Sequence, residues 1–220
     1  MKKIIILVLL FLPQIVNTQI IRGYGTINTH LTGGFERKSI VNFGVGLELK
    51  VFEFLRTEIE ASYYLGTLEN IETTNSDYVA TNFLTRYVTA INYSLSPKFL
   101  IDISQEDDIG IVYLQIIPKY NLTNITAKGS FFSLNNNNSG FNVTDSDTFN
   151  EIRRSFGIGF GIMVKLLGNR SDSFAFNLYY NNVDIGNAIN KLKFSTTSLK
   201  TNNAIGVGIN YYFGFIKKKK

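Results

Sequence analysis

The sequence of 220 residues contains no cysteine and no tryptophan, and it has one histidine, His30. Without cysteine, the chain can form neither a disulfide framework nor a thiolate metal site, and it has no cysteine nucleophile. It also has no cysteine that could carry a lipid at the N-terminus. One histidine is too few for a His-based metal cluster. We therefore expect no metal and no cofactor.

Charged residues are also scarce, at 18% of the chain, whereas roughly 25% is usual in soluble domains. The net charge of +5 comes from six lysines at the two ends, namely Lys2, Lys3 and residues 217–220. Without them, 16 basic and 17 acidic residues remain. No basic surface is left to bind phosphates, so we expect no nucleic-acid partner.

A long apolar run occurs near the N-terminus, at Ile4–Leu12. Basic residues precede it and Pro13 ends it, which is typical of a secretory signal peptide. The run is too short to span a bilayer, which needs about 20 apolar residues, and no later stretch approaches that length. We expect residues 1–18 to be a cleavable signal peptide, residues 19–216 to form one domain, and residues 217–220 to be a basic tail.

The rest of the chain alternates apolar and polar residues with a period of two, which predicts β-strands. The segments with this pattern are 39–51, 56–65, 86–104, 110–122, 156–166, 173–180 and 205–215. In segment 86–104 the odd positions carry no charge, and the even positions include Arg86, Asn92, Ser94, Ser96, Lys98 and Asp102. An eighth strand is expected near residues 20–30, but its two faces cannot be told apart because Ile21 and Ile27 compete with Ile20 and Tyr24.

The connections between these strands alternate in length. Short ones are expected near residues 52–55, 105–108 and 167–172, longer polar loops near 66–81, 128–151 and 186–202, and an intermediate link near 32–38. Short turns at one end and long loops at the other are typical of outer-membrane barrels. The predicted fold is all-β: an eight-stranded antiparallel up-and-down transmembrane β-barrel.

The polar face of these strands indicates which side is outside. It is rich in Gly, Ser and Asn, whereas the polar face of a soluble barrel should carry many Lys and Glu residues. An eight-stranded barrel has room inside only for side chains, so small residues suit its lumen and the apolar stripes suit lipid. We expect the lumen to be plugged by a charge network of Glu48, Lys50, Arg56, Glu58, Glu60, Arg86, Asp102, Lys119 and Lys165. A soluble secreted barrel is the alternative.

The last strand carries the clearest family signal, in Gly208, Tyr211, Phe213 and Phe215. On these residues and the strand pattern, the chain resembles small outer-membrane β-barrel proteins of the OmpA/OmpX-like type, in the version typical of Bacteroidetes, over residues 19–216. The resemblance implies that these four residues are an assembly signal. It also implies location in a Gram-negative outer membrane, with outer-membrane lipid and the barrel assembly machinery as partners. The chain departs from the family in Val207 and in the residues after Phe215.

The fold alone does not determine the function. We expect a structural or binding protein that anchors external loops for an unidentified surface ligand, and not an enzyme. A narrow passive channel is one alternative. The other is a lipid-modifying enzyme, because His30, Ser76 and Asp77 would all lie near the outer rim, an arrangement similar in kind to that of an outer-membrane lipid A palmitoyltransferase.

Overall fold

The computed structural model describes most of the predicted domain. The described residues are 21–31, 39–67, 71–77, 79–104, 110–135, 140–166, 172–181, 183–193 and 204–214. The predicted signal peptide, the link at 32–38, Phe215 and the basic tail lie outside them. No helix in the described part of the chain is long and apolar enough to cross a membrane.

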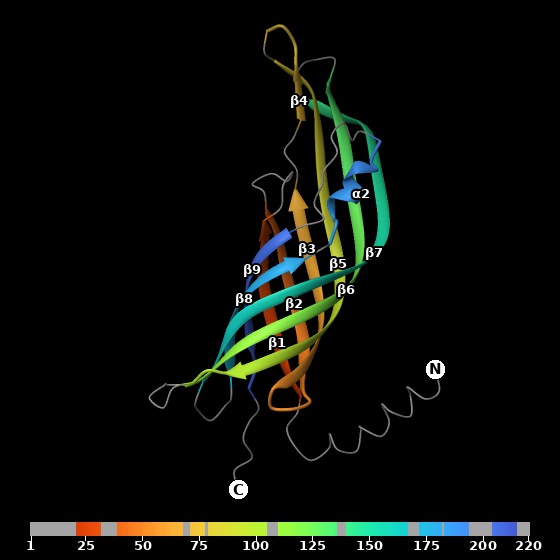
Figure 1. Ribbon diagram of the computed structural model, residues 1–220. Coiled ribbons are helices and arrows are strands. Elements are labelled where there is room, and N and C mark those ends of the chain that lie inside the picture. Colours follow the sequence, from red (N-terminus) through yellow and green to blue (C-terminus); the bar gives the residue numbers. More distant parts are fainter. Residues whose placement is uncertain are drawn as a thin grey trace, which may run out of the picture.

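Eight antiparallel strands form a closed ring in which chain neighbours are also neighbours in the sheet (Figure 1). They are β1 (Ile21–Leu31), β2 (Ser39–Lys50), β3 (Leu55–Thr67), β5 (Ala80–Asp102), β6 (Gly110–Leu134), β7 (Phe141–Leu166), β8 (Ser173–Asn181) and β9 (Ala204–Tyr212). The ring closes where β9 pairs with β1 and β3 pairs with β5. A ninth, short strand, β4 (Ile71–Thr74), pairs with β5 outside the ring. The predicted eight-stranded up-and-down barrel is confirmed.

The pairing register fixes the shape of the barrel. A row of paired residues that leaves β7 at Val164 passes around the ring and returns to β7 at Arg154, ten residues earlier. With a rise of about 3.3 Å per residue and about 4.8 Å between strands, a ten-residue shear over eight strands tilts the strands by about 40°. Membrane barrels have strands tilted by roughly 35–45°.

In the strands whose faces the sequence distinguishes, the two faces are separated as predicted. Along β3 the even positions from Arg56 to Gly66 are buried, while Ile59, Tyr63 and Leu65 on the odd face are exposed. In β1, whose faces the sequence left open, Arg22 and the other even residues point inward. Large apolar side chains therefore cover the outside of the ring, and many polar side chains point to the inside.

Two predicted loops contain strands. Residues 128–151 were expected to be a loop, but β6 continues to Leu134 and β7 begins at Phe141. Likewise β4 and the start of β5 occupy part of the loop expected at 66–81. The prediction failed because β7 is exposed on both faces from Phe141 to Ser146. A strand without a buried face has no apolar alternation to reveal it.

A short segment between β8 and β9 packs against the strands at the loop end. This segment, residues 183–193, is called the cap segment below, and it contains helix α2 (Gly186–Asn190). It buries Val183, Ile185, Ala188, Ile189 and Leu192 against Ile40, Tyr64, Val88, Ala90, Ile125 and Ala127. An apolar core thus lies at the loop end of the barrel, in place of part of the predicted loop at 186–202.

Candidate functional site: the barrel interior and the projecting sheet

A cluster of ion pairs lies inside the ring and centres on Glu48. Its carboxylate accepts a hydrogen bond from Arg22 Nε at 2.6 Å, from Arg56 Nη1 at 2.8 Å, and from Lys98. Lys98 also contacts Glu58. All five side chains are less than a tenth exposed. The five side chains come from β1, β2, β3 and β5, and they form one network of charges inside the ring.

The register explains how the network balances like charges. Glu48 of β2 is directly opposite both Arg22 of β1 and Glu58 of β3. The two carboxylates would repel each other, but Lys98 bridges them. Tyr212 adds a hydrogen bond from its hydroxyl to Glu58, at 2.8 Å, and its ring centroid lies 4.1 Å from the Lys98 ammonium. Burial is tolerable for these charges because each one has a partner.

A second ion pair lies nearer the loop end. Lys119 Nζ is 2.9 Å from Glu60 Oε1, and the Tyr24 hydroxyl donates to the same carboxylate at 3.2 Å. His30 is 2% exposed, with its ring centroid 5.7 Å from that of Tyr64. Towards the loop end, the side chains inside the ring thus change from charged to aromatic, and then to the apolar core under the cap segment.

Hydrogen-bonded side-chain amides and hydroxyls also lie on the inner face of the ring. Hydrogen bonds join Thr26 to Asn210, Asn28 to Asn42, Asn92 to Asn121, Thr123 to Asn92, and Gln115 to Asn177. Inward-facing glycines make room for them: a Cβ at Gly208 would lie 1.7 Å from Asn28 Oδ1, and one at Gly46 would lie 2.5 Å from the Tyr24 ring. The glycines that predicted a crowded lumen lie directly beside larger side chains of the neighbouring strand.

Four residues of the predicted network lie apart from these ion pairs. Lys50 pairs with Glu53 in the turn at 51–54, where the hydrogen bond it donates lowers the pKa of the Glu53 carboxyl. Asp102 is exposed and accepts a hydrogen bond from the Ser104 hydroxyl at 2.6 Å. Lys165 is half-buried at the turn end. The fourth, Arg86, is buried near the cap segment.

Two members of the network, Arg22 and Lys98, are absent from the predicted set. Arg22 was missed because the two faces of its strand could not be told apart. Lys98 was recognised on the polar face of its strand but not included with the charges. Lys98 lies two residues from Ser96 and four from Asp102, so it shares their face. This spacing is the signal that places it with the lumen charges.

The residues of the enzyme alternative do not form a catalytic arrangement. His30 is buried on the inner face of β1, whereas Ser76 and Asp77 are exposed in the turn between β4 and β5. In that turn, the Asp77 backbone N–H donates to the side chain of Asn75 at 3.0 Å. Among the described residues, no group of three or more His, Asp or Glu side chains is placed to hold a metal ion.

The residues of the predicted assembly signal divide between the two faces of β9 and its continuation. Gly208 is buried and faces the lumen. Tyr211 lies on the outer face, with its ring centroid 4.8 Å from that of Phe174, and Phe213 is exposed beside it. The fourth residue, Phe215, is outside the described residues.

A sheet extends beyond the loop end of the ring (Figure 1). This projecting sheet consists of β4, residues 80–86 of β5, residues 128–134 of β6, and residues 141–156 of β7. β8 pairs with β7 only from Gly157 onward, so no described strand pairs with the outer edge of β7 over residues 141–156. Within the described part of the chain, the projecting sheet thus has an edge of 16 residues without a strand partner, called the free edge of β7 below.

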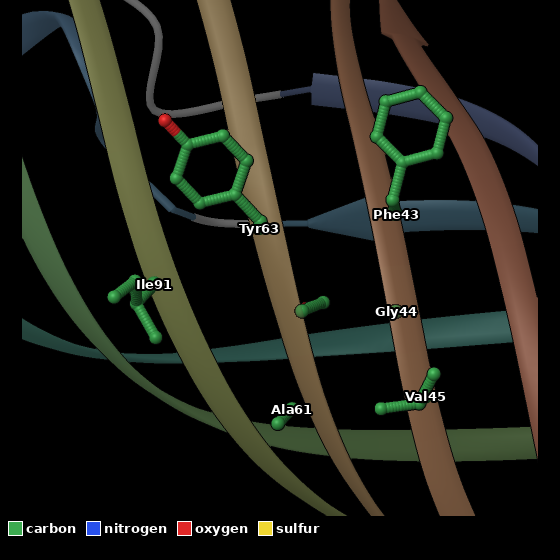
Figure 2. A pocket seen from close by; sticks show the side chains of 7 residues that line it. Phe43, Gly44, Val45, Ala61, Tyr63 and Ile91 are labelled. Atoms are coloured by element: carbon green, nitrogen blue, oxygen red, sulfur yellow. The ribbon is translucent and has the colours of Figure 1, made fainter.

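The outer face of the ring has a shallow hollow of about 380 Å³ over β2, β3 and β5 (Figure 2). Figure 2 shows the small side chain of Ala61 among the larger ones of Val45, Tyr63 and Ile91. Its lining is almost entirely apolar. An apolar outer surface is typical of barrels whose outside faces lipid.

No protein-family model matches the chain, and no curated protein sequence does. Among solved structures, it is similar to Neisserial surface protein A, with a TM-score of 0.47 and 11% identity over 89% of this chain and 96% of that one. A major outer membrane protein from Thermus thermophilus gives 0.43 and 11% over 88% and 99%. The Ail protein of Yersinia pestis, solved in complex with the heparin analogue sucrose octasulfate, gives 0.36 and 11% over 89% and 96%. At such identities and TM-scores, none of the three assigns a function or a ligand to this chain.

Proposed function

We propose that this protein spans the outer membrane of a Gram-negative bacterium and presents its projecting sheet at the cell surface to bind a partner. The outward side chains of the ring support the membrane location. They include Ile27, Phe43, Leu47, Ile59, Ile91, Phe160, Phe176, Leu178, Val207 and Ile209, all exposed. Exposure of so many large apolar groups in water would promote aggregation.

Cell fractionation tests the location. The mature protein should be found in the outer-membrane fraction and should migrate differently on a gel before and after boiling. A mature protein that stays soluble without detergent would instead support the soluble-barrel alternative.

The lumen, in this proposal, is closed to solutes. Three features support this: the network around Glu48, the hydrogen-bonded amides and hydroxyls of the inner face, and the apolar core at the cap segment. In planar bilayers the purified protein should give no stepwise currents. Regular conductance steps would favour the narrow-channel alternative.

The free edge of β7 is the observation that carries the binding role. A long strand edge offers backbone N–H and C=O groups that an extended peptide can pair with, as in β-strand addition. Natural proteins usually protect such edges. Here the protection is partial, because the carboxylates of Asp145 and Asp147 accept hydrogen bonds from the N–H groups of Ser146 and Thr148, at 2.8 and 2.9 Å. The partner we propose is an extended polypeptide segment.

Two experiments test this role: selection of binding peptides from a displayed library, and hydrogen exchange of the barrel with the selected peptides bound. Peptides selected on the purified barrel in nanodiscs should protect backbone amides within residues 141–156. The control variant replaces residues 130–146 by Asn-Gly, which joins Gly129 to Asp147, two residues that are already paired. It should keep heat-modifiable migration and bind peptides more weakly, because only residues 147–156 of the edge remain. Peptides that bind the variant equally well would refute the role of the edge.

The proposal assigns no catalytic activity to the chain. The burial of His30 and the exposure of Ser76 and Asp77 in a separate turn speak against the lipid-modifying alternative. The variant His30→Ala should leave lipid A acylation unchanged. We also propose that the barrel assembly machinery reads the last strand, so that Phe213→Asp should lower the amount of assembled barrel in the outer membrane.

A further inference from the structure

One buried cation in the described part of the barrel has no acidic partner. Arg86 lies on the inner face of β5 between Leu84 and Val88 and is 5% exposed. Its Nε and Nη1 atoms are buried and have no hydrogen-bond partner. Leaving buried donors unpaired costs free energy, and an unpaired buried charge costs more.

The other buried basic side chains set the contrast. Each has a carboxylate partner: Arg22 and Arg56 pair with Glu48, Lys98 with Glu48 and Glu58, and Lys119 with Glu60. Arg86 is the exception among the described residues. Its position at the loop end, above those carboxylates, separates it from the network.

The acidic groups nearest in the register are already engaged. Arg86 is opposite Gly129, which is opposite Asp147. The Asp147 carboxylate accepts hydrogen bonds from the backbone N–H groups of Thr148 and Lys193, at 2.9 and 2.8 Å. Further along β7, the Glu151 carboxylate is 3.1 Å from Arg153 and 3.5 Å from Lys191.

Apolar groups lie beside the aliphatic part of the Arg86 side chain. A Cβ at Gly129 would lie 3.8 Å from Arg86 Cγ and 3.3 Å from Leu192 Cδ1, so the cap segment lies close over this site. Leu192 itself is buried. Electrostatic attraction is stronger in such surroundings than in water, and the guanidinium geometry matches the two oxygens of an oxyanion.

We propose that Arg86 is the binding residue for a small oxyanionic group at the loop end of the barrel, beneath the cap segment. The shared chemistry of its ligand is that of a carboxylate, phosphate or sulfate group. This site is separate from the edge of β7 and does not depend on the partner proposed for that edge.

Calorimetry and thermal unfolding of the full barrel in detergent micelles test the site. Sodium phosphate, sodium sulfate and sodium acetate are titrated at constant ionic strength, with sodium chloride as the reference. At least one of the three should bind saturably and raise the unfolding temperature, because a ligand that binds only the folded state stabilises it. Preference for phosphate or sulfate would indicate a tetrahedral oxyanion, and preference for acetate would indicate a carboxylate.

Three variants assign the binding to Arg86. Arg86→Met should abolish it, and Arg86→Lys should weaken it by about tenfold, because an ammonium lacks the planar fork. Arg154→Gln removes an exposed arginine of β7 and should leave binding unchanged. If Arg86→Met does not fold, Arg86→Lys alone still tests the site. Absence of saturable binding to all three anions, or unchanged affinity in the Arg86 variants, would overturn the proposal.

Discussion

At the scale of single residues, the interior depends on charges that share partners. The Glu48 carboxylate is the acceptor for cations from β1, β3 and β5, and it is almost completely buried. Removing one member of a buried network leaves the others uncompensated. The contribution of Glu48 should therefore greatly exceed that of an exposed ion pair.

The variant Glu48→Gln tests this. It should lower the free energy of unfolding by about 3–5 kcal/mol, because three cations lose their shared counter-charge. Urea unfolding in lipid vesicles measures the change. The matched control is Glu53→Gln in the exposed turn, where ion pairs contribute little. Equal stability of the two variants would contradict the network.

The glycines of the lumen provide a second test. Gly46→Ala would place a Cβ 2.5 Å from the Tyr24 ring and 2.6 Å from the Ile59 carbonyl oxygen. Overpacking of this kind costs about 1–3 kcal/mol. The temperature at which the folded form converts to the unfolded form on a gel should therefore fall. Gly25→Ala is the control, since nothing lies within 4 Å of its Cβ position on the outer face. A larger loss for Gly25→Ala would mean that the two faces are assigned the wrong way round.

At the scale of elements, a strand can be predicted from the sequence where one of its faces points to the interior and the other to the outside. Segments such as β3 have this contrast, and their positions and inward faces follow from the alternation alone. The polar end of β7 meets water on both faces and has no contrast, so it resembles a loop in the sequence. The cap segment was missed for a different reason. Its apolar residues pack against strands that are distant in the chain, and such contacts are not local properties of a sequence.

A charge on the outer face of β3 tests the same contrast. Ile59 is 62% exposed and lies opposite Leu47 and Leu95. Ile59→Lys should destabilise the barrel by about 2–4 kcal/mol if this position faces hydrocarbon. Thr148→Lys in the projecting sheet, an exposed position, should have little effect. Unfolding in lipid vesicles compares them, and a harmless Ile59→Lys would argue against lipid contact.

At the scale of the whole molecule, the ten-residue shear and the eight strands set a lumen that side chains can fill. Alternation predicts which residues face it, but not which charges meet. Those contacts depend on the register between strands that are far apart in sequence, such as β1 and β9. The projecting sheet likewise could not be predicted from alternation, because it arises where β5, β6 and β7 are longer than the barrel needs.

The central claim is that the apolar stripes face lipid and the polar stripes face a filled interior. The absence of cysteine makes single-cysteine labelling straightforward. Spin labels at Glu58→Cys, Ile59→Cys, Glu60→Cys, Ala61→Cys, Ser62→Cys and Tyr63→Cys in lipid vesicles report the accessibility of each site to oxygen dissolved in the bilayer. Accessibility should alternate, high at residues 59, 61 and 63 and low at 58, 60 and 62. Uniform accessibility, or maxima at the even positions, would contradict the claim.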